Sequence, residues 1–228
     1  MTRMETAPPA LETPETPAPP KMLRRLRALF ATPKAEWVRI AAEPMSVRRV
    51  MLGWVAPLAA IGPVAKLIGS QVLRYMGDGM HLPEPFTSAL TGAVIGYMLT
   101  LLFVYLLALI VNGLAVTFKG KRDLVQALKL AGYGGTPVYL AAILEIWPPL
   151  ALLEVVGLYS LYLILAGLPI LMHVPRKRAL AYTAVTMLIG IGLAILQALI
   201  VAGSRDMFTP EIPDSAWNYT PPDDHPHR

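Results

Sequence analysis

The stretch LILAGLPILMHVPRKRALAYTAVTML, residues 163–188, contains the pattern that decides the fold of this protein. An apolar run ends at His173, three consecutive cations follow at 176–178, and a second apolar run begins at Ala179. Apolar segments joined by a short basic loop are typical of membrane proteins, because Lys and Arg are enriched in the cytoplasmic loops between spanning helices. The cations at 176–178 are therefore interpreted first as a determinant of topology and second as a contact site.

The composition supports a membrane protein. Of the 228 residues, 55% are hydrophobic and 15% are charged, whereas soluble domains are about a quarter charged. The absence of cysteine excludes disulfide bonds, a thiolate nucleophile and cysteine metal ligands. The net charge of +5 does not indicate nucleic-acid binding, because the cations lie in short loops between apolar runs.

Five apolar blocks are long enough to cross a bilayer, which takes roughly 20 helical residues. They predict an all-α membrane protein with five transmembrane helices, at about 48–69, 88–117, 127–147, 150–174 and 179–203. Glycines and Pro137 interrupt the third block, which is predicted to be either a kinked or a broken span. The turn Trp147-Pro148-Pro149 predicts that the third and fourth blocks form a helical hairpin.

The distribution of cations predicts the orientation. Sixteen of the 20 Lys and Arg residues lie in the N-terminal segment up to Arg49, in the region from Lys119 to Lys129 at the start of the third block, or in the loop between the fourth and fifth blocks. Three lie on the opposite side, and Lys66 lies within the first block. Because cationic loops remain in the cytoplasm, we expect the N-terminus to be cytoplasmic and the C-terminus to be outside.

Two tails and one surface segment flank the apolar blocks. Residues 1–20 contain six prolines and residues 204–228 are proline-rich and acidic, so both are predicted to be disordered. Residues 21–47 are predicted to form an amphipathic basic segment on the membrane surface, and 48–203 the membrane domain. Within the surface segment, Thr32-Pro33 predicts the start of a second short helix that places Trp37 and Ile40 on one face.

The first short helix of the surface segment, residues 22–31, places Leu23, Leu26 and Phe30 on one face. This face is predicted to lie on an anionic membrane surface, and a soluble helix packed on a loop is the alternative. Arginines on the rest of this helix, together with the basic loop, are the predicted contacts for lipid headgroups or a protein partner. They are Arg24, Arg25, Arg27, Arg176, Lys177 and Arg178.

Three stretches resemble the Yip1 domain family in its bacterial form. They are TPKAEWVRIAAEP (32–44), FKGKRDLVQALKLAGYGGTPVYLAAIL (118–144) and LYSLYLILAGLPILMHVPRKRALAYTAVT (158–186). The resemblance covers roughly residues 30–203 and implies five spans with a cytoplasmic N-terminus. Eukaryotic members act in membrane traffic with small GTPases of the Rab kind, but their acidic, proline-containing N-terminal signature is absent here. For bacterial members, the resemblance implies an integral membrane protein without assigned chemistry.

Polar residues within the apolar blocks have ordinary structural interpretations. Lys66 and Lys129 lie near span ends, where lysine extends its ammonium group to the interface. Glu145 and Glu154 flank the Pro-Pro turn, where they are interpreted as interfacial residues, with a cation- or proton-binding pair as the alternative. Asn112 and Gln197 are expected to form hydrogen bonds between helices, and Gly92–Gly96 is a weak GxxxG contact signal.

No stretch indicates catalysis. Ser160 and His173 are 13 residues apart on one predicted helix, which separates them by about 20 Å and excludes a dyad. We therefore expect no enzyme activity, no cofactor and no metal site. The sequence predicts a non-enzymatic adaptor or organiser of a bacterial inner membrane that contacts anionic lipids, a protein partner or a second copy of itself. The alternative is a small transporter or channel that uses the interrupted third block.

Overall fold

The computed structural model describes residues 22–76 and 85–206, and all regular structure within these ranges is helical. The α-helices are α1 (Met22–Ala31), α2 (Pro33–Ala42), α3 (Val47–Val50), α4 (Ala56–Ala59), α5 (Ile61–Met76), α6 (Phe86–Leu114), α7 (Leu124–Gly134), α8 (Thr136–Ala141), α9 (Tyr159–Leu171) and α10 (Arg176–Asp206). A π-helix, η1 (Met51–Val55), and two 3-10 helices, η2 (Ala142–Ile146) and η3 (Pro148–Leu158), complete the described chain. The tails predicted at 1–20 and 204–228 lie outside the described residues, except that residues 204–206 belong to α10.

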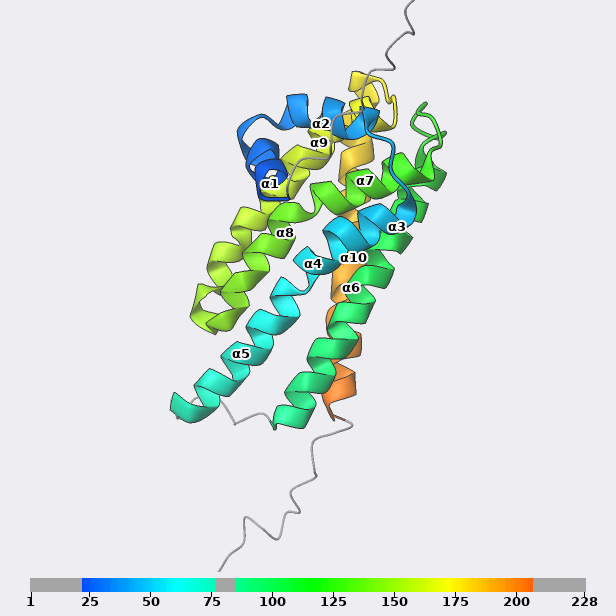
Figure 1. The fold of residues 1–228 in the computed structure, drawn as a ribbon. Helices are drawn as coiled ribbons and strands as arrows, with labels where there is room; N and C mark the ends of the chain where they lie inside the picture. The colour runs from blue at the N-terminus through cyan, green and yellow to red at the C-terminus, as the bar shows by residue number, and fades with distance from the viewer. Residues whose placement is uncertain (1–21, 77–84, 207–228) are drawn as a thin grey trace, which may run out of the picture.

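Within residues 22–76 and 85–206, three helical segments are long and apolar enough to cross a membrane: Val47–Val72, Phe86–Leu114 and Arg176–Ser204. They agree within three residues with the first, second and fifth predicted blocks, and they lie side by side along the length of the molecule (Figure 1). The last of them, α10, is the least enclosed by the protein. It exposes a row of large apolar side chains that includes Leu188, Ile195 and Leu199, as expected for a helix surrounded by lipid.

The third and fourth predicted blocks form a hairpin of short helices. The third block is broken, since α7 ends at Gly134 and α8 begins a new direction with Pro137 in its first turn. A shorter apolar helix, Val155–Leu171, lies within the fourth block. The predicted hairpin is therefore confirmed as η2 packed against η3. The prediction of five spans is not confirmed, because three segments in the described part of the chain have spanning length.

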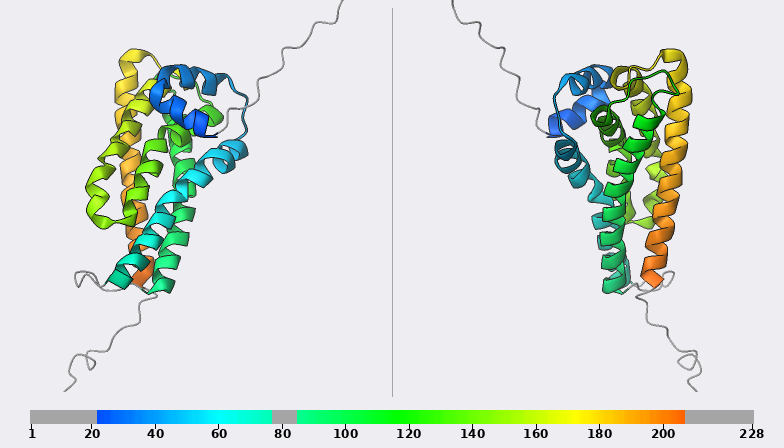
Figure 2. Two further views of the ribbon diagram at one scale, coloured as in Figure 1. Left: turned by 60° about the vertical axis from the view of Figure 1, so that its left-hand side comes forward. Right: turned by 90° about the vertical axis from the view of Figure 1, so that its right-hand side faces the viewer.

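The hairpin ends before the long helices do (Figures 1 and 2). Its turn packs against α5 at Gly69, where an added Cβ would lie 2.4 Å from the carbonyl oxygen of Ile146. Glycine permits this approach, and α5 continues to Met76, about 10 Å further along the helix axis. The hairpin starts and finishes at the end of the molecule that carries α1. It therefore adds either two crossings or none, and in both cases α1 and the last turn of α10 lie at opposite ends.

The core lies at the end that carries α1 and α2, where these helices cover α7 and α9 (Figure 1). Trp37 and Ile40 of α2 are completely buried, which confirms the face predicted for that helix. They pack with side chains of α7 and α9 such as Leu128, Leu130 and Leu163. The N-terminal segment is therefore an integral part of the folded protein rather than a separate surface peptide.

Candidate functional site at the basic end

Helix α1 packs on the protein by a face other than the one predicted to lie on the membrane surface. Leu29 is completely buried and Arg25 is 5% exposed, whereas Leu23 is 73% exposed and Phe30 is 39% exposed. Arg25 and Leu29 are four residues apart and so share a helical face. The predicted contact of Arg25 with lipid or a partner is wrong, because its guanidinium group points into the protein.

Arg25 lies at the centre of a buried cluster of charged groups. Its Nε donates to Glu36 Oε1 at 3.2 Å, its Nη1 donates to Tyr133 Oη at 3.0 Å, and its Nη2 donates to Glu43 Oε2. Burial alone would lower the pKa of Arg25, but Tyr133 and Glu43 raise it above its ordinary value. The guanidinium group therefore keeps its charge, and it joins α1 to α2 and α7.

Lys129 completes this cluster from α7. It is 1% exposed, and its ammonium group donates to the backbone carbonyls of Ile40 at 2.8 Å and Glu43 at 2.7 Å. These carbonyls belong to the C-terminal turn of α2, where a positive charge is favourable. The interpretation of Lys129 as a lysine that reaches the interface is wrong, because its side chain caps a helix inside the protein.

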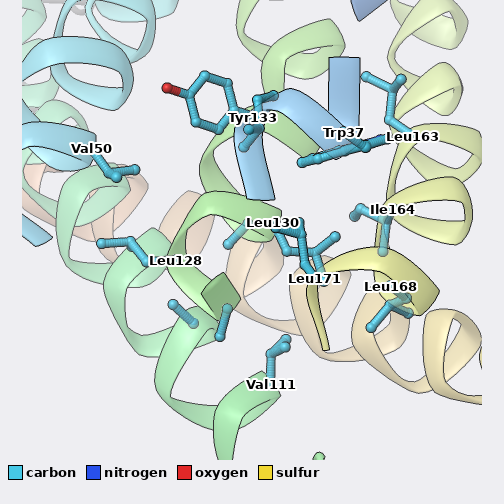
Figure 3. Packing of buried hydrophobic residues seen from close by; sticks show 14 of the residues in the cluster. Trp37, Val50, Val111, Leu128, Leu130, Tyr133, Leu163, Ile164, Leu168 and Leu171 are labelled. Atoms are coloured by element: carbon cyan, nitrogen blue, oxygen red, sulfur yellow. The ribbon is translucent and has the colours of Figure 1, made fainter. Parts of the chain in front are cut away.

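The three sequence stretches that resemble the Yip1 family meet in this region. The first supplies Glu36 and Trp37, the second supplies Lys129 and Tyr133, and the third supplies Gly167 of α9. An added Cβ at Gly167 would lie 2.8 Å from Trp37 Cε2, so glycine lets the indole ring pack directly against α9. Figure 3 shows Trp37 between side chains of α7 and α9. The three stretches that carry the family resemblance therefore pack together as one unit of the structure.

Exposed cations surround this unit, and we call them the basic cap. On the N-terminal segment they are Arg24, Arg27, Lys34, Arg39, Arg48 and Arg49. On the loops after α6 and α9 they are Lys119, Lys121, Arg122, Arg176, Lys177 and Arg178. These segments lie toward the same end of the molecule (Figure 1). The structure thus brings together all the predicted contact residues except Arg25.

The two basic loops of the cap are fixed to each other. The amide of Lys121 donates to the carbonyl of Met172 at 2.8 Å, and Arg178 Nη1 donates to the carbonyl of Thr117 at 3.1 Å. Lys119 and His173 each follow a helix end with positive φ, at 59° and 52°, a conformation that reverses the chain after a helix. The backbone thus holds these exposed cations in a defined arrangement.

Other polar residues singled out from the sequence lie elsewhere. Glu145 Oε2 lies 3.8 Å from the ammonium group of Lys66, while the side chain of its suggested partner Glu154 lies outside the described residues. Gln197 joins α10 to α6, as predicted, by donating to Thr100 Oγ1 at 2.8 Å and to the carbonyl of Gly96 at 3.2 Å. Asn112 Oδ1 is buried and accepts no hydrogen bond within the described part. No group of three metal-ligating side chains is present in 22–76 and 85–206.

The fold and this site define an all-helical integral membrane protein whose charged end is held together from inside. The model of the Yip1 domain matches residues 27–197, and the chain therefore belongs to the Yip1 domain family. The inner membrane protein YohC of Escherichia coli K12 is 27% identical over 179 residues, which cover 76% of this chain and 92% of the relative. The YohC protein of Escherichia coli O6:H1 matches with the same values. No solved structure gives a significant match.

These similarities, together with the apolar helices of spanning length, confirm the predicted location in a bacterial inner membrane. The family match also begins two residues after Arg25 and includes Glu36, Lys129 and Tyr133. The burial of Arg25 was not apparent from its sequence. A usable signal was present on α2, where Glu36 and Glu43 share a helical stripe with the buried Ile40. Carboxylates on a buried face require cationic partners.

Proposed function

We propose that this protein is a non-enzymatic organiser of the inner membrane whose basic cap binds anionic lipid headgroups. The observation that carries the proposal is the gathering of twelve exposed cations at the end where α1 and α2 are packed. Each cation near an anionic leaflet contributes about 1 kcal/mol of attraction. A set of them on a rigid support therefore retains lipid without a deep binding pocket.

Two details of α1 support headgroup binding. Arg24 and Arg27 form no ion pair within the described residues, so their charges are available to an external anion. Leu23 is 73% exposed beside them, and on α2 Val38 is 58% exposed. Exposed apolar side chains next to cations are the combination that interfacial helices use. The proposal therefore assigns headgroup contact to Arg24, Arg27 and the loop cations Arg176–Arg178.

The test uses the full chain, because α1 and α2 pack on α7 and α9 and an isolated peptide would lose this support. The protein is reconstituted in phosphatidylcholine vesicles that contain a minority of phosphatidylglycerol. Lipids retained after mild detergent extraction are then counted by native mass spectrometry. We expect the wild type to retain phosphatidylglycerol in preference, and less of it as the salt concentration rises.

The informative variant is Arg24→Glu with Arg27→Glu, and the matched control is Arg24→Lys with Arg27→Lys. The first pair reverses charge on an exposed face, whereas the second preserves it. Loss of phosphatidylglycerol enrichment in the Glu pair alone supports the proposal, and equal enrichment in all three proteins contradicts it. A proximity screen with the same variants tests for a protein partner. If the wild type recovers one partner that the Glu pair does not, and no lipid enrichment is seen, the ligand of the basic cap is a protein rather than a lipid.

A second candidate function is a small transporter or channel. The observation that favours it is the break of the third block at Gly135, beside a cavity that α8 helps to line. Because this cavity is mainly apolar, its substrate would be apolar rather than ionic. Flux of a labelled apolar solute in liposomes that depends on the protein would support this candidate.

A further inference from the structure

A cavity lies within the part of the protein formed by the long helices, away from the basic cap. It has two chambers of about 440 Å³ and 250 Å³, and both are lined by Thr100, Val138, Tyr139, Ala194 and Gln197. Because these five residues line both chambers, the chambers adjoin each other. α6 and α10 form one wall, and α8 of the hairpin forms another. Val138 and Ile191 line the smaller chamber and are 51% and 52% exposed, so the cavity opens sideways, toward the region that lipid occupies.

Two residues that line the smaller chamber carry hydroxyl groups without a partner in the described part of the chain. Among the described residues, Ser160 Oγ of α9 and Thr186 Oγ1 of α10 are buried and form no hydrogen bond, and both residues are 2% exposed. Helical threonines commonly bond to the carbonyl four residues earlier, as Thr183 does to Ala179 at 2.8 Å. Thr186 makes no such bond. A buried hydroxyl without a partner is unfavourable, so these groups can donate to a polar atom of a ligand.

The chemistry of the lining restricts the ligand. Among the described residues, no charged side chain lines the smaller chamber, while Lys66 and Glu145 line the larger chamber and lie 3.8 Å from each other. The ligand is therefore uncharged where it meets the hydroxyl groups, and it offers acceptors to two donors. The rest of it must be apolar and elongated, because the lining of both chambers is mainly apolar.

The depth of the hydroxyl groups excludes the ester carbonyls of ordinary phospholipids. Thr186 lies ten residues after the start of α10 at Arg176, or about 15 Å along the helix. Phospholipid esters lie near the headgroups, whereas these donors lie well inside the apolar length of α10. A neutral lipid that carries carbonyl groups into the hydrocarbon interior satisfies both conditions.

We propose that this cavity binds an isoprenoid quinone of the surrounding bilayer. Its carbonyl oxygens accept hydrogen bonds from Ser160 and Thr186, its ring occupies the smaller chamber, and its apolar chain extends into the larger one. The quinone enters sideways past Val138 and Ile191. The proposal concerns binding alone and is independent of the basic cap, which lies at the end of the molecule.

The experiment measures binding of decylubiquinone to the full chain in nanodiscs, together with chromatographic analysis of quinone extracted from protein purified in mild detergent. The test variant is Ser160→Ala with Thr186→Val. Because it removes two hydrogen bonds to the quinone, we expect roughly tenfold weaker binding. The matched control is Thr183→Val on the same helix, whose hydroxyl already has a partner and does not line the cavity; it should bind as the wild type does.

A second variant, Ala194→Phe, fills the junction of the chambers and should abolish binding even if the hydroxyl contribution is small. Melting curves of each variant without ligand establish that it is folded. Saturable wild-type binding that both cavity variants weaken supports the proposal. Failure of decylubiquinone to bind the folded wild type, or equal binding by the wild type and both cavity variants, overturns it. Extraction of phospholipid without quinone also overturns it.

Discussion

The buried charge cluster and the lateral cavity differ in whether their buried polar groups have hydrogen-bond partners. In the cluster, Arg25, Glu36 and Lys129 are almost completely buried, and each contacts a group of opposite charge or a backbone carbonyl. In the cavity, Ser160 and Thr186 are equally buried and contact no acceptor. Polar burial with partners indicates a structural role, whereas polar burial without partners indicates a place for something else. Substitutions in the two regions should therefore have effects of opposite sign.

The largest effect is expected at Arg25. Arg25→Ala removes the buried cation from Glu36, which keeps only the exposed Arg39 at 3.4 Å, and it removes the donor to Tyr133. Breaking a buried ion pair costs about 3–5 kcal/mol. The measurement is the free energy of unfolding of the detergent-solubilised protein in a denaturant titration. Arg24→Ala, on the exposed neighbouring residue, should change it by less than about 0.5 kcal/mol. Equal effects of the two substitutions would show that the cluster does not hold α1.

A somewhat smaller loss is expected at Lys129. Lys129→Met keeps the apolar length of the side chain but leaves the carbonyls of Ile40 and Glu43 without their donor. Hydrogen bonds from charged groups contribute about 1.5–3 kcal/mol each, so we expect a loss of roughly 2–3 kcal/mol in the same titration. Lys66→Met is the control, since the Lys66 side chain is 52% exposed; an exposed ion pair contributes at most about 1 kcal/mol. A larger loss of stability for Lys66→Met than for Lys129→Met would show that Lys66, and not Lys129, is the structurally important lysine.

Gly167 tests the packing of α2 without changing any charge. Gly167→Ala places a methyl group against the ring of Trp37, and overpacking of this kind costs about 1–3 kcal/mol. Gly192→Ala on α10 is the matched control, because a Cβ there meets no atom within 4 Å. Tryptophan fluorescence during thermal unfolding should show a lower melting temperature for Gly167→Ala than for Gly192→Ala. The same temperature for both would mean that Trp37 is not held against α9.

Two buried threonines, one with a hydrogen-bond partner and one without, give the most direct comparison of the two regions. Thr136 is completely buried and accepts a hydrogen bond from Trp54 Nε1 at 3.1 Å, so Thr136→Val should cost about 1–3 kcal/mol by leaving the indole N–H unpaired. Thr186→Val removes a hydroxyl that has no partner, and in ligand-free protein it should leave stability unchanged or raise it slightly. Melting temperatures of the two delipidated variants give the comparison. A clear loss for Thr186→Val would show that its hydroxyl has a structural partner.

The sequence predicted the parts of the fold that depend on a single helix. The spanning lengths at Val47–Val72, Phe86–Leu114 and Arg176–Ser204 follow from uninterrupted hydropathy, and the hairpin follows from its Pro-Pro turn. The depth of the hairpin was not predictable, because it depends on where Ile146 meets Gly69 of another helix. Composition alone could not distinguish these short helices from full spans.

The site was less predictable than the fold. The gathering of the basic loops followed from the loop-charge rule, but three adjacent arginines on α1 look equivalent in sequence. The inward position of Arg25 depends on Glu36, Glu43 and Tyr133, the last of them 108 residues away. The two unpartnered hydroxyl groups could not be distinguished from ordinary helical Ser and Thr, since their environment is formed by residues of α6, α7, α8, α9 and α10.

The long separation between Arg25 and Tyr133 also sets an order of assembly in the cell. At roughly 5–20 residues per second, the ribosome makes Tyr133 on the order of ten seconds after Arg25, and Gly167 later still. Until then Trp37 has neither α7 nor α9 to pack on, and the end of α2 lacks its contact with Lys129. The helices that are synthesised first are consequently among the last to be packed in place. During that interval, the nascent N-terminal segment is exposed to insertion factors, chaperones and proteases at the membrane surface.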